Sequence, residues 1–365
     1  MRKSILQKKV FFLLVVVFCL TSFVVNVQAE SWSWIKVADN VNLQSVDMVN
    51  STDGWAVGSE GTINHWDGIR WNNIGSPTTA NLRAVDIISS NEAYAISFAT
   101  VIPINESVIS WNGASWKNVT TPRSYLRSVD MISSTDGWAV GYGGLTIRWD
   151  GINWTRIESP TNTPLESISA INATDAWAVG SNKYNSGIFH WNGTGWNIVE
   201  SPEIVGTRTL WSVDMVSSSD GWAVGDSGII IRWDGVTWKN VTSPIPAGKH
   251  LFSVNMISST NGWAVGSDGT IIHWDGTSWS NIASPTGAWL SCVNMVSSTD
   301  GWIVGADGVY RWQEVAGFPS QYLIIIIAVF AVVVVAWFLI RKKYPTPTRN
   351  ESFTLNRQLP HAKVQ

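Results

Sequence analysis

The sequence predicts an all-β protein, and three observations support that fold class. The pentapeptide Gly-Trp-Ala-Val-Gly, or a close variant, appears seven times at intervals of 39 to 45 residues. A Trp-(Asp/Asn)-Gly-x-x-Trp motif follows six of the seven copies. The region that contains these motifs lacks an apolar period of about 3.6 residues long enough for a helix. Self-similarity at a period of about 40 residues indicates a repeat fold, in which no single unit can bury its own apolar face.

Each repeat predicts four short strands. The stretch 251–285 shows them most clearly, with strands expected at 252–257, 263–266, 270–274 and 279–283. Each is rich in β-branched or aromatic residues and is bounded by Gly, Asn, Asp, Ser or Pro, which are typical of strand ends and tight turns. The Asp-Gly or Asn-Gly pair between the third and fourth strands tolerates positive φ, so we expect a hairpin there. One repeat therefore forms one four-stranded antiparallel sheet.

The N-terminus is expected to complete the last repeat, which ends at Trp312 after its third strand. The segment Ser33–Val37 aligns with the fourth-strand segment Ser115–Val119, and both lead into the same Leu-x-Ser-Val-Asp-Met run. An N-terminal strand that pairs with the last sheet closes a ring and leaves no unpaired edge between the chain ends. The predicted fold is therefore a seven-bladed β-propeller closed by the N-terminal strand, over residues 30–315.

The repeats resemble the Asp-box (BNR) class of β-propellers, in particular the photosystem II stability and assembly factor type of repeat. The matching residues are Gly262–Gly266, then Gly269–Ile271 and then Asp275–Trp279, and the resemblance covers residues 34–312. It implies the propeller fold, and it implies a role as an assembly or stability factor as one candidate function. Propellers host many unrelated activities, so function has to be inferred from the site itself.

The N-terminal residues 1–29 predict a secretory signal peptide. Basic residues precede an apolar run over 10–25, and Val27-Gln28-Ala29 offers a small-residue cleavage site. An uncleaved membrane anchor is the alternative, although the apolar run is short for a membrane span.

The C-terminal part predicts one membrane-spanning helix. After a short linker at 316–321, residues 322–340 (Tyr322 to Ile340) carry no charge over 19 positions and precede Arg341, Lys342 and Lys343. This length spans a bilayer, and the basic cluster places the tail at 341–365 in the cytoplasm, where its Pro-rich polar composition predicts disorder. We expect a single-pass protein of the cell membrane with the propeller outside.

The charge of the predicted ectodomain limits its partners. Residues 30–319 contain 14 Lys or Arg and 26 Asp or Glu, whereas the whole chain has a net charge of only −3. An acidic domain disfavours nucleic acid and anionic lipid as ligands. We therefore expect a protein or a glycan as the partner.

Loop variation predicts which face of the propeller binds it. The loops between strands one and two, and between strands three and four, are nearly constant and share one face. The variable loops lie at 97–106, 141–145, 181–186, 200–209 and 243–250, and alternating strand direction places them on the opposite face. Binding residues usually lie on variable loops held by a rigid scaffold. The third strand of the last repeat leaves from the constant face, so the variable face should be membrane-distal.

A more specific site follows from the residue after the Leu that opens each innermost strand, because its position is fixed while its identity varies. Around the ring these residues are Gln44, Arg83, Arg127, Glu166, Trp211, Phe252 and Ser291. Tyr125, His250 and Trp289 are expected beside them. We interpret the set as a recognition ring at the mouth of the central channel. The alternative is a set of solvated strand starts whose identities drift.

The sequence does not predict catalytic residues, a cofactor or a metal site. Three histidines share one third-strand position of separate repeats and should diverge rather than converge on a metal: His65, His190 and His273. Four aspartates on first strands are replaced by Asn or Ser in other repeats, which favours blade-to-blade hydrogen bonding over catalysis: Asp47, Asp86, Asp130 and Asp214. A second series is interpreted as turn residues: Asp53, Asp136, Asp220 and Asp300.

Most of the 24 Trp residues recur at fixed positions of the repeat and are expected to be wedges between sheets. Trp211 and Trp289 lie outside this pattern, and an exposed indole face can stack on a sugar. Cys292, the one thiol of the predicted mature chain, takes the place of a Ser in other repeats and should be a small buried residue.

These observations favour a non-enzymatic, membrane-anchored recognition module for a surface glycan or a protein partner. The alternative function is an assembly or stability factor for a membrane protein complex. A sialidase-like glycosidase is the least favoured, since the repeat positions do not assemble an Arg cluster with a Tyr and paired carboxylates.

Overall fold

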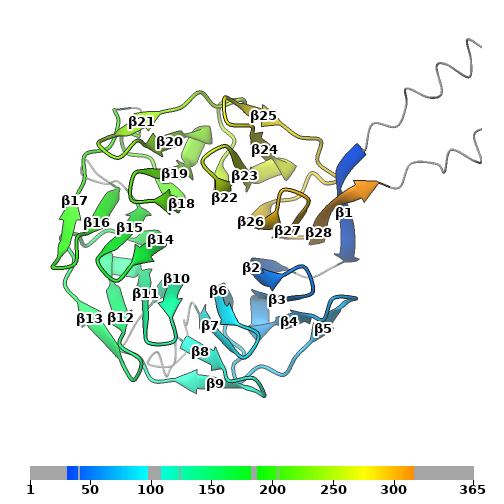
Figure 1. The fold of residues 1–365 in the computed structure, drawn as a ribbon, viewed down its shortest axis with the longest axis horizontal. Helices are drawn as coiled ribbons and strands as arrows, with labels where there is room; N and C mark the ends of the chain where they lie inside the picture. The colour runs from blue at the N-terminus through cyan, green and yellow to red at the C-terminus, as the bar shows by residue number, and fades with distance from the viewer. Residues whose placement is uncertain are drawn as a thin grey trace, which may run out of the picture. The chain divides into compact units, whose positions relative to one another are not determined.

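The computed structural model describes residues 31–39, 42–97, 108–122, 125–181, 187–203 and 205–315. Seven four-stranded sheets surround a common axis (Figure 1). The compact unit that contains them spans Trp32–Glu314. The prediction of an all-β, seven-bladed propeller is therefore confirmed.

The predicted signal peptide, linker, membrane helix and tail (1–29, 316–321, 322–340 and 341–365) lie outside the described residues. Within the ranges that the structure describes, no helix has the length and apolar character needed to cross a bilayer.

The innermost strand of each blade begins at the repeated Leu and has eight residues. These strands are β2 (Leu43–Asn50), β6 (Leu82–Ser89), β10 (Leu126–Ser133), β14 (Leu165–Asn172), β18 (Leu210–Ser217), β22 (Leu251–Ser258) and β26 (Leu290–Ser297), in blades 1 to 7. The second strands contain the pentapeptide: β3 (Asp53–Gly58), β7 (Glu92–Ser97), β11 (Asp136–Gly141), β15 (Asp175–Gly180), β19 (Asp220–Gly225), β23 (Asn261–Gly266) and β27 (Asp300–Gly305).

The third strands end at the first Trp of the hairpin motif in blades 1 to 6. They are β4 (Ile63–Trp66), β8 (Val108–Trp111), β12 (Thr146–Trp149), β16 (Ile188–Trp191), β20 (Ile230–Trp233), β24 (Ile271–Trp274) and β28 (Gly308–Val315). The outer strands are β5 (Trp71–Asn73), β9 (Trp116–Val119), β13 (Trp154–Ile157), β17 (Trp196–Ile198), β21 (Trp238–Asn240), β25 (Trp279–Asn281) and, in blade 7, β1 (Ser31–Asp39). Single 3₁₀ turns follow four of the second strands: η1 (Ser59–Gly61), η2 (Tyr142–Gly144), η3 (Asp226–Gly228) and η4 (Ser267–Gly269).

The N-terminal strand closes the ring as predicted. The last sheet has the order β1-β28-β27-β26, and Figure 1 shows β1 in blue beside β28 in orange. Trp34 of β1 is buried, with its ring centroid 5.5 Å from that of Trp312 and 5.4 Å from that of Trp263 in blade 6. The first and last described strands thus bury a shared aromatic contact, so blade 7 forms only when both ends of the propeller are present.

Close packing favours two glycines of the pentapeptide, as blade 3 shows. A Cβ at Gly137 would lie 2.4 Å from Met131 Sδ, and one at Gly141 would lie 2.0 Å from the carbonyl oxygen of Tyr125. The first glycine becomes Ala93 and Ala176 in blades 2 and 4, where the facing Met of the innermost strand is replaced by a residue without sulfur. The replacement of the first glycine by Ala in blades 2 and 4 therefore follows from the smaller or sulfur-free residue that faces it.

The tryptophans are wedges between blades, as predicted. The aromatic residue of each second strand packs against two Trp residues of the next blade; Trp138, for example, lies 4.9 Å from Trp191 and 5.3 Å from Trp196, with the second pair T-shaped. All three are at least 94% buried. Aromatic pairs of this kind add about 0.5–1.5 kcal/mol beyond the burial of their area.

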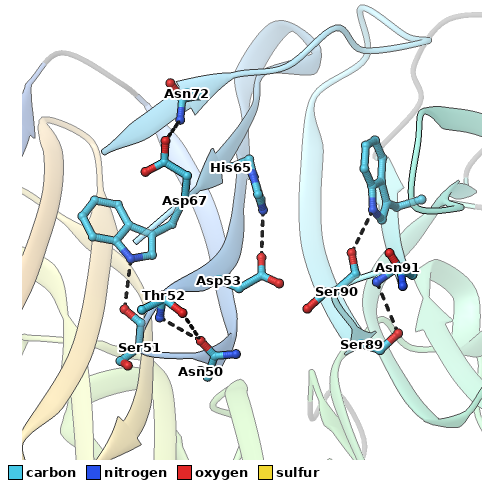
Figure 2. A network of polar contacts seen from close by, with 12 residues as sticks. Asn50, Ser51, Thr52, Asp53, His65, Asp67, Asn72, Ser89, Ser90 and Asn91 are labelled. Atoms are coloured by element: carbon cyan, nitrogen blue, oxygen red, sulfur yellow. Dashed lines mark hydrogen bonds and ion pairs between the residues drawn. The ribbon is translucent and has the colours of Figure 1, made fainter. Parts of the chain in front are cut away.

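The constant face is organised by side chains of the two short turns (Figure 2). The main-chain N–H of Thr52 donates to Asn50 Oδ1 at 2.8 Å, and Asp67 Oδ1 accepts the main-chain N–H of Ile69 at 2.8 Å. A Cβ at Gly68 would lie 3.0 Å from Thr52, so the two turns of blade 1 pack together. Both constant loops therefore lie on one face, as the sequence predicted.

The interpretation of the Asp53 series as turn residues is wrong. Asp53 begins the second strand and bonds across the sheet to the third, with its Oδ1 2.8 Å from His65 Nε2, as Figure 2 shows. Asp136 accepts two bonds from Arg148, at 2.8 and 2.9 Å. The same pairing recurs in blades 4 to 7 with His or Arg as the partner: Asp175–His190, Asp220–Arg232, Asn261–His273 and Asp300–Arg311. A sequence pattern could not reveal this cross-strand pairing.

Hydrogen bonds between innermost strands link every blade to the next, which confirms the structural interpretation of the first-strand aspartates. In six of these links a main-chain N–H group donates, over 2.5 to 3.1 Å, to a side chain of the preceding blade. The pairs are Ile87 to Asp47, Met131 to Asp86, Ala170 to Asp130, Met215 to Ser169, Met256 to Asp214 and Met295 to Asn255. Asn294 Nδ2 closes the circle with a 2.8 Å bond to Asp47 Oδ1. We call the seven linking side chains, of which four are carboxylates, the carboxylate belt: Asp47, Asp86, Asp130, Ser169, Asp214, Asn255 and Asn294.

Burial raises the pKa of the Asp side chains in the carboxylate belt. Desolvation raises the pKa of Asp47 to about 6, that of Asp130 to about 7 and that of Asp214 to about 6. Asp86 lies between Asp47 and Asp130 in the circle, and desolvation, together with repulsion from these two neighbours, raises its pKa well above the usual value for Asp. Main-chain donors oppose these shifts but do not cancel them.

Candidate recognition site on the variable face

The seven residues of the predicted ring occupy the same backbone feature, a β-bulge at the start of each innermost strand. Leu43 pairs with Gly58 and Ser45 with Val57, which leaves Gln44 as an extra residue between two ladder positions. The same register shift occurs in the other six blades. We call these residues the axial ring. A bulge re-aims its side chain out of the ladder, and bulges are common beside functional sites.

The residue before each Leu is anchored by its main chain. The carbonyl oxygens of Tyr125, His250 and Trp289 accept N–H groups of Tyr142, Ser267 and Ala306 at 2.9 to 3.0 Å. The backbone is therefore fixed on both sides of the opening Leu, while the side chains there differ from blade to blade. The Trp289 side chain is 61% exposed and that of Tyr125 39%.

Blades 1 to 4 contribute a polar arc to the axial ring. Arg83 Nη1 donates to Gln44 Oε1 at 3.5 Å, and Arg127 Nη1 lies 3.3 Å from Glu166 Oε2. The guanidinium of Arg127 also lies 5.9 Å from the ring centroid of Tyr142, a residue of η2 that the sequence prediction missed. Neighbouring blades therefore bring four of the predicted residues together.

Burial dominates the electrostatics of the polar arc. Desolvation raises the pKa of Glu166 despite the attraction of Arg127 and Arg83. Desolvation also lowers the pKa of Arg83, and repulsion from Arg127 adds to this effect. The arc therefore holds its charges in a partly dehydrated environment, where each charge interacts more strongly than in water.

A cavity of about 230 Å³ opens within the polar arc. Its lining residues are Gln44, Ser59, Asn81, Arg83 and Arg127. The main-chain N–H of Glu60 donates to Asn81 Oδ1 at 2.9 Å, which fixes the amide of Asn81 beside η1. Ser59 and Asn81 were not predicted, although Asn81 directly precedes Leu82 and is therefore the blade 2 equivalent of Tyr125, His250 and Trp289.

Blades 5 to 7 contribute an aromatic arc. The ring of Phe252 lies 6.3 Å from Trp211 in a T-shaped pair and 5.7 Å from Trp289 in a tilted pair. His250 stacks on Phe252 with an interplanar angle of 5° and a centroid distance of 6.2 Å. Four predicted residues thus form one continuous group.

Asp226 of η3 orders the aromatic arc. Its Oδ1 accepts a hydrogen bond from Trp211 Nε1 at 2.7 Å and lies 3.0 Å from His250 Nδ1, while Oδ2 accepts the main-chain N–H of Thr209 at 3.0 Å. Asp226 was not predicted from the sequence, since other repeats place Ser, Phe, Tyr or Ala at the equivalent loop position. Asp226 could have been found because an acidic residue directly after the pentapeptide departs from the residue types of the other repeats.

The three third-strand histidines lie apart from the site. His65, His190 and His273 bond within their own blades, and desolvation lowers the pKa of His273. Among the residues described by the structure, no group of three or more His, Cys, Asp or Glu side chains is placed to hold a metal ion. Cys292 Sγ donates to the carbonyl oxygen of Val46 at 3.6 Å, and burial raises its pKa.

Comparisons with known proteins support the fold. The sequence matches no protein-family model and no curated protein. Among solved structures, one described as YCF48 bound to D1 peptide aligns over 79% of this chain and 96% of its own, with 15% identity and a TM-score of 0.63. YCF48 from Cyanidioschyzon merolae aligns over 78% and 99%, with 16% identity and a TM-score of 0.60. The WD40 β-propeller domain of Doa1 aligns over 78% and 96%, with 12% identity and a TM-score of 0.59.

The chain folds like these propellers. The resemblance to the photosystem II stability and assembly factor type of repeat, first seen in the sequence, is confirmed in the architecture of the blades. At these levels of identity the similarity shows the fold alone, so the function of this chain has to be argued from its own site.

Proposed function

We propose that this chain is a non-enzymatic recognition module that binds a protein partner through the axial ring. The observation that carries the proposal is the set of seven bulges, which present six residue types at one fixed backbone position. The repeated side chains elsewhere are used in wedges, cross-strand pairs and the carboxylate belt. The axial ring is where the chain varies its chemistry without changing its fold.

The neighbouring structures support a protein as the partner. One of them is YCF48 bound to D1 peptide, so a propeller of this architecture can bind a peptide. A second candidate function, favoured by the same neighbour, is that of an assembly or stability factor for a membrane protein complex. A glycan is the alternative ligand, since the exposed indole of Trp289 offers a face on which a sugar could stack.

We further propose that the propeller is extracytoplasmic and anchored in the cell membrane. The support is the sequence of residues 1–29 and 322–340, with the basic cluster that follows. β28 is antiparallel to β27 and therefore runs toward the constant face. A helix that begins shortly after β28 would leave the variable face free to meet a partner away from the bilayer.

The test is co-purification of the full-length chain after chemical cross-linking in its native membrane, followed by mass spectrometry. Changing Arg83, Arg127 and Trp211 together to Ala should abolish capture of the partner, with the far-ultraviolet circular dichroism of the sheets unchanged. A matched triple variant changes three exposed residues of the constant-face hairpins, Ile69, Ile152 and Val236, which are 85%, 79% and 78% exposed, and it should retain the partner.

The outcome also separates the candidate functions. Unassembled subunits of one complex among the captured proteins would identify an assembly factor, whereas release of the partner by a free glycan would identify a glycan ligand. Equal capture by the axial-ring variant and the wild type would contradict the proposal, and so would hydrolysis of a glycan panel by the purified protein.

A further inference from the structure

We propose that the cavity between blades 1 and 3 binds one carboxylate group, which Arg83 and Arg127 hold. The proposal rests on the proposed function and specifies its chemistry: the partner presents an acidic side chain or a chain terminus to the polar arc.

The polar arc carries an uncompensated positive charge. Arg127 pairs with Glu166 at 3.3 Å, whereas Arg83 donates a long, 3.5 Å bond to the neutral amide of Gln44. Among the described residues, no carboxylate forms an ion pair with Arg83. Within the described part of the arc, two guanidinium groups therefore lie beside one carboxylate, that of Glu166, in a predicted ectodomain where acidic residues outnumber basic ones by 26 to 14. Partly buried Arg side chains are usually paired, because removing an unpaired charge from water is costly.

The lining of the cavity suits an anion. Its five residues, Gln44, Ser59, Asn81, Arg83 and Arg127, all have side-chain hydrogen-bond donors, and none of them is acidic. The amide oxygen of Asn81 already accepts the N–H of Glu60, so a ligand would meet Asn81 as a donor. Donors from blades 1, 2 and 3 thus surround one space.

Size and charge select the carboxylate among anions. A volume of about 230 Å³ is below the roughly 300–1,000 Å³ of pockets for small organic ligands, so the cavity suits a single side chain rather than a larger molecule. One surplus positive charge balances the single charge of a carboxylate, whereas a phosphate group carries about −1.5 to −2 at neutral pH. A planar carboxylate also matches the fork of a guanidinium group in two parallel hydrogen bonds.

The test is a titration of the full-length, ¹⁵N-arginine-labelled protein with N-acetylglutamate N-methylamide, followed by NMR of the arginine Nε–Hε resonances. We expect saturable shifts of the Arg83 and Arg127 resonances with a Kd on the order of 1–10 mM. Inorganic phosphate should bind more weakly, and sodium chloride at the same ionic strength should give no saturable shift.

Two variants make the test specific. Arg83→Gln places at the bulge of blade 2 the residue that blade 1 carries as Gln44, so the fold should tolerate it, and its affinity for the probe should fall about tenfold or more. Arg156→Gln removes the same charge from an exposed position on β13 and should leave the affinity unchanged.

Four results would overturn the inference: no saturable shift with the probe, tighter binding of phosphate, an equal loss in Arg156→Gln, or full affinity in Arg83→Gln. Its failure is distinguishable from failure of the proposed function. A partner that is captured through the axial ring while the probe does not bind contradicts only the carboxylate assignment. Probe binding without any captured partner contradicts the recognition function instead.

Discussion

The two faces of the propeller are built from the same strands and differ in what they keep constant. On the constant face, each blade repeats its turns and an Asp, Asn or Glu at the start of the second strand, and six of these residues bond to a third-strand His or Arg. On the variable face, each blade repeats the opening Leu and the backbone bulge, while the residue at the bulge is of six types in the seven blades. The comparison shows that the same side-chain bonds recur from blade to blade at one end of the strands, whereas at the other end the main-chain bonds recur and the side-chain bonds, such as that of Asp226 to the N–H of Thr209, differ between blades.

The largest expected effect is the difference in stability loss between replacing a tryptophan buried between blades and replacing one on the variable face. Trp138→Ala leaves a large void between blades 3 and 4 and should lower the free energy of unfolding by about 3–5 kcal/mol. Trp289→Ala removes a ring that is 61% exposed and should cost less than about 1 kcal/mol. Urea unfolding followed by tryptophan fluorescence measures both. Equal losses would remove the distinction between the faces.

A pH-dependent effect is expected from the carboxylate belt. The pKa of Asp130 in the folded protein, about 7, lies above the value near 4 for an exposed Asp, so the folded state is penalised progressively as pH rises from about 4 to about 7. Asp130→Asn keeps an oxygen for the N–H of Ala170 and matches Asn255 and Asn294 of blades 6 and 7. It should raise the stability at pH 8 by about 2 kcal/mol and have little effect at pH 4.

Thermal unfolding between pH 4 and pH 8 compares the Asp130→Asn variant with the wild type. A stability gain that is equal at both ends of this range would show that the carboxylate charge is not the cause, and a loss at pH 8 would contradict the account of the belt.

A smaller effect is expected from the cross-strand pairs of the constant face. Arg148→Ala removes two hydrogen bonds to Asp136 and one to the carbonyl oxygen of Ala173, and should cost about 1–2 kcal/mol. Arg148→His installs the residue that blades 1 and 4 place opposite their own Asp, and should cost clearly less than the Ala variant. Chemical unfolding at pH 7 compares the two. A His variant as unstable as the Ala variant would show that the pairing depends on arginine alone.

The smallest effect is expected at Cys292. Five other blades place Ser at the equivalent position, and the Ser hydroxyls accept main-chain N–H groups of the next blade; that of Ser45 accepts from Val85 at 3.3 Å. Cys292→Ser should therefore change the free energy of unfolding by less than about 0.5 kcal/mol. A loss of several kcal/mol in the same unfolding assay would reveal a role for the thiol that the repeat pattern does not explain.

The sequence predicted the parts of the structure that depend on repetition. Blade number, closure by Ser31–Asp39, the Trp wedges and the bonds from Asp47, Asp86, Asp130 and Asp214 all follow from comparing equivalent positions. It missed the bulge at Gln44 and its equivalents, because a shift of one residue depends on how two strands pair. The partners Tyr142, Ser59 and Asp226 were missed as well: they share the position directly after the pentapeptide, but its residue type differs between blades, so repetition did not single it out.

Position in the sequence predicted that Tyr125 and Trp289 lie beside the axial ring, but it did not predict which side chains touch. Trp289 contacts Phe252, whereas Arg127, two residues after Tyr125, contacts the ring of Tyr142. Trp289 and Phe252 come from successive blades, whereas Arg127 and Tyr142 come from two segments of one blade, and neither contact can be read along one strand.

The most direct test of the axial ring as the recognition surface is site-specific photo-cross-linking of the full-length chain in its native membrane. A photoreactive phenylalanine analogue replaces Phe252 in the ring or, as the matched position on the constant face, the exposed Ile152. We expect one partner to be cross-linked at position 252 and not at position 152. Cross-linking at position 152 with none at position 252 would contradict the account, because the partner would then bind the face that the repeats keep constant.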